Sequence, residues 1–182
     1  MINEALLARA RQDLQARAEA VAGIEFFSVP PRDFDFADIR GGFGRGHLAG
    51  WLRQGLGNHL ALPVIYRLTA GDQLQADALR DAFENFVPAA PAKLPRNNAI
   101  ADSLTIYVGS SLDIRKRLRE HLGSAANGTF ALRMRSWCPP VDGRVRVEVS
   151  AVLGDVTSSQ VQDVEDALWR SSRPMFGRLG PK

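Results

Sequence analysis

The chain has few of the residue types on which disulfide-stabilised and zinc-binding proteins depend. Its 182 residues include one cysteine, two tyrosines and three histidines. The single Cys138 cannot form an internal disulfide or a cysteine-rich zinc site. Since no histidine lies near it in the sequence, we expect a packed thiol rather than a nucleophile.

Long apolar runs are also missing. No segment approaches the roughly 20 apolar residues of a membrane-spanning helix, and residues 1–20 lack the apolar stretch of a signal peptide. With 45% hydrophobic and 24% charged residues, the composition is that of an ordinary globular chain that can bury a sizeable core. We therefore expect a cytoplasmic protein with no membrane partner.

The positive charge is modest in sum and uneven in place. The net charge is +3 at pH 7, and the isoelectric point is near 9.5. Cationic residues gather between residues 115 and 146, where few acids oppose them. Such local fields bind phosphate backbones, although a solvated helix face is the plainer explanation for part of the cluster. The candidate nucleic-acid contacts are Arg115, Lys116, Arg119, Arg133 and Arg135.

Residues 113–122 are predicted to form a helix with a polar pair on one flank. Serines and an aspartate stand at its start, and a glycine follows its end, as is typical of helix termini. Apolar residues recur every four positions from Ile114, so they form the buried stripe. Arg117 and His121 lie four residues apart on one flank of that stripe, where they would face the same neighbour.

A second predicted helix, residues 158–171, places one carboxylate toward the core. It begins with a capping box, and Val161, Val164 and Leu168 form its apolar stripe. Glu165 falls at the edge of that stripe. A carboxylate there is costly unless it is paired or holds a metal ion; the alternative is a glutamate at the rim that reaches water.

These elements occur in an order that resembles the GIY-YIG nucleases. The sequence PVIY at residues 63–66 stands for the first strand motif of that family, and YVG at residues 107–109 matches the second. The spacing from YVG to Arg117 and His121 matches the family pattern, and the helix of Glu165 resembles the family's closing helix. The resemblance implies a divalent-metal-dependent DNA endonuclease. The site residues that it implies are Tyr66, Tyr107, Arg117, His121 and Glu165.

Within this resemblance, phosphodiester hydrolysis gives each residue a role. Glu165 would hold one divalent cation, Mg²⁺ or alternatively Mn²⁺, and Arg117 would bind the scissile phosphate. Tyr66 would orient or deprotonate the attacking water, and Tyr107 would position water or phosphate. His121 would accept a proton or lower the cost of phenolate, because a free tyrosine with a pKa near ~10 is a poor base at neutral pH. The expected partner is DNA, with RNA second.

The chain departs from the family pattern in three places. Val64 replaces the first glycine of the first motif, and Gly177 stands where the family has an asparagine that supports the site. The segment between the tyrosines, about residues 70–102, is much longer than a hairpin loop and contains a predicted helix at residues 76–86. Gly177 leaves open a second function, a catalytically impaired nucleic-acid-binding module on the same fold.

The predicted fold is α+β, with a small three-stranded antiparallel sheet flanked by helices. Its strands are expected at residues 63–68, 103–109 and 144–153, with the helix–loop insertion between the first two. Residues 1–60 would form an N-terminal helical extension, and residues 61–182 would form the nuclease-like domain.

The N-terminal segment has an apolar stripe of its own. Leu7, Ala10, Leu14, Ala18 and Val21 recur at steps of three and four, as in an amphipathic helix of two heptads. Alanines in so short a seam favour docking on the chain's own core over dimerisation. Dimerisation through this helix, without affinity for nucleic acid, is a third alternative. Monomer and homodimer both stay open.

Overall fold

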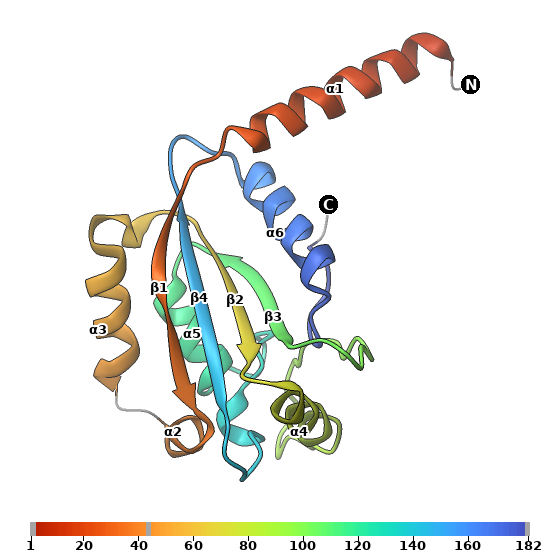
Figure 1. Cartoon of the computed structure of the whole chain (residues 1–182). Coiled ribbons are helices and arrows are strands. Elements are labelled where there is room, and N and C mark those ends of the chain that lie inside the picture. Colours follow the sequence, from red (N-terminus) through yellow and green to blue (C-terminus); the bar gives the residue numbers. More distant parts are fainter. Residues whose placement is uncertain (1–2, 43–44, 181–182) are drawn as a thin grey trace.

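One antiparallel sheet organises the chain in the computed structural model, which describes residues 3–42 and 45–180 (Figure 1). The strands lie in the order β1-β4-β2-β3, so β1 and β3 form the two edges. The α+β class is confirmed, but the prediction of three strands was wrong, because the sheet has four. The strands are β1 (Phe26–Asp35), β2 (Val64–Ala70), β3 (Thr105–Ser111) and β4 (Arg144–Val152).

The sequence did not predict the strand β1, which pairs with β4 along its whole length. Its register shifts between Val29 and Arg32, and Pro30 and Pro31 lie within that shift. Proline has no N–H to donate to a ladder, so it is confined to edge strands and bulges, and β1 is both an edge and irregular. Residues 1–60 are therefore not helical throughout.

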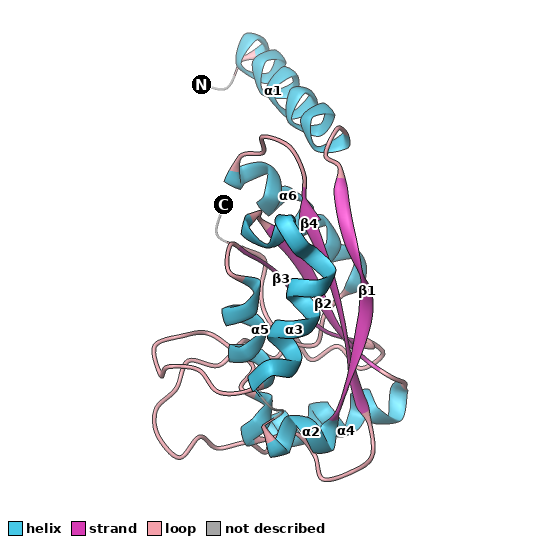
Figure 2. Cartoon of the chain, turned by 90° about the vertical axis from the view of Figure 1, so that its left-hand side faces the viewer, coloured by secondary structure: helices cyan, strands magenta, loops and turns pink. Residues whose placement is uncertain are grey.

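Helices cover both faces of the sheet (Figures 1 and 2). Successive strand residues point to opposite faces, and they join different cores here. Tyr66 belongs to the large core with Leu52 and Leu118, whereas Ile65 packs in a smaller cluster with Val161. The helices are α1 (Glu4–Ala22), α2 (Phe36–Gly41), α3 (Arg45–Leu56), α4 (Gln73–Glu84), α5 (Ile114–Leu122) and α6 (Ser158–Ser172).

The other predicted elements are confirmed to within a few residues. The three predicted strands correspond to β2, β3 and β4, and the helix in the insertion corresponds to α4. Asp113 caps α5 by accepting a hydrogen bond from the backbone amide of Lys116, and Thr157 and Gln160 form the predicted capping box of α6. Cys138 is buried in the core, where burial raises the pKa of its thiol to about 12, as befits a packed thiol.

The helix α1 projects away from the sheet in both views (Figures 1 and 2). None of its residues is buried, and Leu7 and Leu14 are 47% and 67% exposed. It touches α6, where Arg17 forms an exposed ion pair with Asp163, and exposed ion pairs contribute little to stability. The prediction that its apolar stripe docks on the chain's own core was therefore wrong. Within the described ranges, no helix is long and apolar enough to cross a membrane.

Substitutions at two glycines of α3 test whether this helix packs against β1. A Cβ added at Gly55 would overlap the side chain of Val29 on β1, whereas one added at Gly50 would meet nothing within 4 Å. Gly55→Ala should lower the free energy of unfolding by about 1–3 kcal/mol through overpacking. Gly50→Ala should raise it by about 0.5–1 kcal/mol through helix propensity. Urea unfolding measures both, and shifts of equal sign and size would contradict the packing of α3 on β1.

Candidate active site

The two tyrosines lie on neighbouring strands and face the same core. Tyr66 on β2 lies opposite Gly109 on β3, and the rings of Tyr66 and Tyr107 are nearly parallel, with centroids 6.2 Å apart. A Cβ added at Gly109 would lie 2.6 Å from the Tyr66 hydroxyl oxygen. The glycine of the YVG motif therefore leaves the room that the hydroxyl of Tyr66 occupies.

Two side chains of α5 meet that hydroxyl. The Nε of Arg117 donates to the Tyr66 hydroxyl oxygen at 3.1 Å, and the Nε2 of His121 lies 3.0 Å from the same oxygen. Residues four apart on a helix lie on one face, and the register of α5 aims this face at β2. The predicted polar pair is thus brought together with the first tyrosine.

A backbone amide fixes which nitrogen of His121 carries the proton. The N–H of Leu132 donates to Nδ1 at 3.3 Å, and an amide can only donate, so Nδ1 is unprotonated. Burial, with a smaller effect from the charge of Arg117, holds the pKa of His121 well below its ordinary value, so the ring is neutral. A neutral imidazole carries one N–H, which leaves Nε2 as the donor to Tyr66.

Arg117 is anchored by more than Tyr66. Its Nη1 donates to the carbonyl of Phe130 at 2.8 Å and lies 3.4 Å from a carboxylate oxygen of Glu120, and its Nη2 donates to the Tyr107 hydroxyl at 3.3 Å. A guanidinium has five N–H groups, so little of the fork is unused. A phosphate would compete first with the two longest of these contacts, those to Glu120 and Tyr107.

Glu165 approaches the cluster from α6, past the edge strand β3. It is half-buried, and burial raises the pKa of its carboxyl above the ordinary value, an effect that the Ser110 side chain opposes. Its charge also acts on Arg117, Tyr66 and Tyr107. No ion pair joins Glu165 to a cation among the described residues.

Glu165 is a single carboxylate rather than part of a ligand cluster. In the described part of the chain, no group of three or more His, Cys, Asp or Glu side chains is placed to hold a metal ion. Mg²⁺ is commonly held by one or two carboxylates and completes its shell with water and phosphate oxygens. A half-buried carboxylate without a cationic partner therefore fits one such ion.

The cluster has a buried layer and an accessible layer. Tyr66 and His121 are 1% and 0% exposed, whereas Tyr107, Arg117 and Glu165 are partly exposed. Burial raises the pKa of both tyrosines, and Arg117 partly opposes that rise. Solvent and substrate therefore meet the accessible layer first, and the buried layer holds it in place.

Four of the five candidate nucleic-acid contacts gather at one cavity, and the fifth does not. Arg133 is buried, and its guanidinium donates to the carbonyls of Ala125 and Ala126. It holds the loop after α5, and its burial there argues against the predicted contact with a nucleic acid. A cavity of about 690 Å³ between α3 and α5 is lined by Arg115, Lys116, Arg119 and Arg135.

Gly177 adjoins the accessible layer. It has a φ of +109°, and a Cβ added there would lie 3.1 Å from Cε2 of Tyr107 and 3.8 Å from Nε1 of Trp169. That Nε1 is buried and has no hydrogen-bond partner within residues 3–42 and 45–180. The resemblance leads one to expect an asparagine side chain at this position. Gly177 has no side chain, and the Nε1 of Trp169 beside it has no partner among the described residues.

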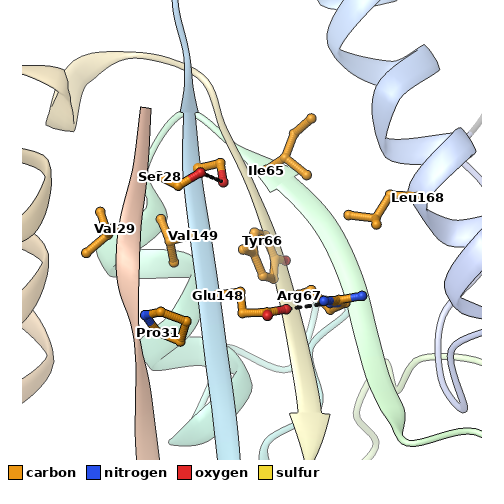
Figure 3. A pocket seen from close by; sticks show the side chains of 10 residues that line it. Ser28, Val29, Pro31, Ile65, Tyr66, Arg67, Glu148, Val149 and Leu168 are labelled. Atoms are coloured by element: carbon orange, nitrogen blue, oxygen red, sulfur yellow. Dashed lines mark hydrogen bonds and ion pairs between the residues drawn. The ribbon is translucent and has the colours of Figure 1, made fainter. Parts of the chain in front are cut away.

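A second cavity, of about 330 Å³, lies on the other face of the sheet (Figure 3). Arg67 forms an ion pair with Glu148 in its wall, and Ser28 and Ser150 share a hydrogen bond. Since strand side chains alternate, Arg67 lies on the face opposite the Tyr66 hydroxyl. Tyr66 is among the residues that line this cavity, but its hydroxyl group contacts Arg117 and His121 on the opposite face.

Sequence reasoning missed four supporting groups. Two are backbone groups, the Leu132 amide and the Phe130 carbonyl, and no residue type marks either. The side chain of Ser110 and the space at Gly109 were within reach, because both lie in or beside the YVG motif.

Searches against protein-family models, curated proteins and solved structures give no match to this chain. The functional argument therefore rests on the geometry of the cluster together with the motifs.

The neutral buried state of His121 predicts a pH dependence of stability. Its folded pKa lies below the unfolded value near 6.5, so only the unfolded state gains a proton as pH falls from 6.5 toward 5. Stability should be lost in that window, by up to about 1.4 kcal/mol per pH unit. Glu165 acts in the opposite direction, because its pKa is raised.

Comparing the wild type with His121→Gln isolates the contribution of His121 to the pH dependence of stability, because the contribution of Glu165 is present in both proteins. Denaturant unfolding at pH 5 to 7 should give a flatter pH profile for His121→Gln than for the wild type. His47→Gln, a change at an exposed residue of α3, should keep the wild-type profile. A wild-type profile in His121→Gln would contradict the neutral buried ring.

Proposed function

We propose that this protein is a divalent-metal-dependent endonuclease that hydrolyses phosphodiester bonds in DNA. The observation that carries the proposal is the convergence of Tyr66, Tyr107, Arg117, His121 and Glu165. They come from β2, β3, α5 and α6 and span 100 positions of the sequence. This set in this order is what the two motifs led us to expect. A recognised DNA site, a branched structure and a damaged strand are all compatible with it.

The electrostatics of the cluster favour a reaction site over a packing feature. Half-buried carboxylates destabilise a fold unless they are paired or hydrogen-bonded; Ser110 hydrogen-bonds Glu165, but no cation among the described residues forms an ion pair with it. Groups with perturbed pKa values gather at functional sites. Here Tyr66, Tyr107, His121 and Glu165 are all perturbed, chiefly by burial.

The accessible layer would bind the phosphodiester. Glu165 would hold one Mg²⁺, which supplies Lewis-acid stabilisation of phosphate charge when bound. Arg117 would place its positive charge beside the scissile phosphate, exchanging its 3.3 Å bond to Tyr107 for a phosphate oxygen. The freed Tyr107 hydroxyl would then hydrogen-bond water or phosphate from the edge strand.

The buried layer would orient the attacking water. The Tyr66 oxygen already accepts from Arg117 and faces the His121 donor, so its own proton is directed away from both. Burial raises the pKa of Tyr66, so the neutral hydroxyl is the resting form. The two donors lower the cost of any negative charge that develops on its oxygen. Of the two roles expected for His121, this arrangement favours support of the tyrosine over acceptance of a proton.

The second candidate function is a nucleic-acid-binding module with impaired catalysis. The specific observation in its favour is the unsatisfied Nε1 of Trp169 beside Gly177. A site that lacks one polar support next to Tyr107 holds its accessible layer less firmly, and small misplacements of reacting groups are costly to catalysis. The two candidates share DNA binding and differ in turnover.

Glu165→Gln removes the charge of the proposed metal ligand and preserves its shape. Supercoiled plasmid and a single-stranded circle should both be tested with Mg²⁺ and with chelator. We expect Mg²⁺-dependent cutting of one or both by the wild type and a loss of about 10²-fold or more in the variant, on the scale of losing a major electrostatic contact. Asp163→Asn, on the same helix, should cut like the wild type.

Equal cutting by Glu165→Gln and wild type would overturn the assignment of Glu165. If the wild type binds both DNAs and cuts neither, the impaired binding module becomes the better account.

Arg117→Lys keeps the charge and removes the fork that reaches Tyr66, Tyr107 and the Phe130 carbonyl together. We expect kcat to fall by about 10²-fold, with folding retained by thermal melting. Arg9→Lys, at an exposed position of α1, should change neither kcat nor stability. Full activity in Arg117→Lys would show that only the charge is needed at this position.

A further inference from the structure

The groove between α3 and α5 has the properties of an anion-binding site separate from the tyrosine cluster. Its wall includes Leu48 and Ala49 from α3, and four cationic side chains line it, three from α5 and one from the 3-10 helix η2 (Met134–Ser136). Figure 2 shows α3 and α5 side by side on the same side of the sheet. The groove volume is about 690 Å³. Its cationic residues are Arg115, Lys116, Arg119 and Arg135.

No residue in the described part of the chain neutralises the cationic side chains of this groove. None of the four cationic side chains forms an ion pair or a side-chain hydrogen bond with any residue in the ranges 3–42 and 45–180. The acid in the wall is Asp113, whose side chain already accepts the amide of Lys116 at the start of α5. Four cations and one carboxylate give the lining a net charge of +3, equal to that of the whole chain.

Several other arginines of this protein are placed differently. Arg67, Arg146 and Arg17 each have a carboxylate partner, and the two terminal nitrogens of Arg133 donate to carbonyls. Like charges held together without partners repel one another and destabilise the compact state. A polyanion bound between α3 and α5 would therefore relieve repulsion within this unpaired set.

We propose that this groove binds the phosphates of a nucleic-acid strand at a second site, away from the bond that is cut. The proposal rests on the proposed function for its substrate class. Arg115 and Arg119 lie one turn apart along α5, on the flank opposite Arg117, so they offer charges in a row rather than a single point. Such a row suits the repeated charges of a phosphate backbone, which it would bind without reading sequence.

The two sites are separated by about the width of one helix, on the order of 10 Å. At ~3.4 Å of rise per nucleotide, that width corresponds to roughly three nucleotides. A strand that crosses α5 would therefore be held on both sides of that helix. The groove would position the strand and leave the chemistry to the tyrosine cluster.

The test compares two double variants that lose the same charge. Arg115→Gln with Arg119→Gln alters the groove, and Arg9→Gln with Arg11→Gln alters two exposed arginines of α1. Fluorescence anisotropy with a labelled 20-base-pair duplex and a 20-nucleotide single strand, in chelator and at several salt concentrations, measures binding without cleavage. The groove variant should lose on the order of tenfold or more in affinity at 0.1 M salt, and its salt slope should fall by about 1 to 2.

The α1 variant should keep the wild-type salt slope and nearly all the affinity. Equal losses in the two variants, or no binding by the wild type, would overturn the proposal. A poly-glutamate peptide that binds the groove as tightly as the duplex would also overturn it, in favour of an acidic protein partner.

Cleavage separates this proposal from the proposed function. If the wild type cuts DNA and the groove variant shows the same KM, the groove proposal fails and the endonuclease stands. If the groove variant shows a raised KM with unchanged kcat, both stand. If the wild type binds duplex but never cuts it, and the groove variant loses that binding, the result supports the groove proposal. The endonuclease proposal is then left without support.

Discussion

The hydroxyl of Tyr66 is the point on which the candidate site depends. Its oxygen takes the Nε–H of Arg117 and faces the Nε2 of His121, and both partners have second anchors, at the Phe130 carbonyl and the Leu132 amide. Buried hydrogen bonds of this kind are costly to leave unmade. The network therefore fixes α5 against β2. It also fixes the position of Arg117, whose charge acts on Glu165.

The sheet order determines which groups can be reached from outside. With β3 at an edge, α6 can bring Glu165 past that strand to side chains that belong to the opposite face. Gly109 leaves the Tyr66 hydroxyl room at this edge. β1 forms the other edge of the sheet, where it pairs with β4 and packs on α3. Through α3, this unexpected strand also shapes the cationic groove, so the first sixty residues support the second half of the chain.

The sequence was most informative where local rules act. Regular apolar spacing and caps located α5 and α6, and alternating valines located β4. It failed where tertiary contacts decide. β1 was missed because Pro30 and Pro31 interrupt its alternation, and its pairing partner is over one hundred residues away. Arg133 looked like a surface cation, but carbonyls of the loop after α5 enclose it. The sequence motifs predicted the members of the tyrosine cluster. The Phe130 carbonyl and the Leu132 amide, which hold Arg117 and His121, are backbone groups that no residue type reveals.

The tautomer of His121 tests the central claim most directly, because it decides whether this ring supports Tyr66 or accepts its proton. Long-range ¹H–¹⁵N NMR spectra of the histidine side chains, recorded on both sides of pH 6.5, distinguish the two. The account predicts that His121 is neutral throughout, with the proton on Nε2 and with Nδ1 accepting the Leu132 amide. A proton on Nδ1, or protonation of the ring near pH 6.5, would contradict it and would return His121 to the role of a base.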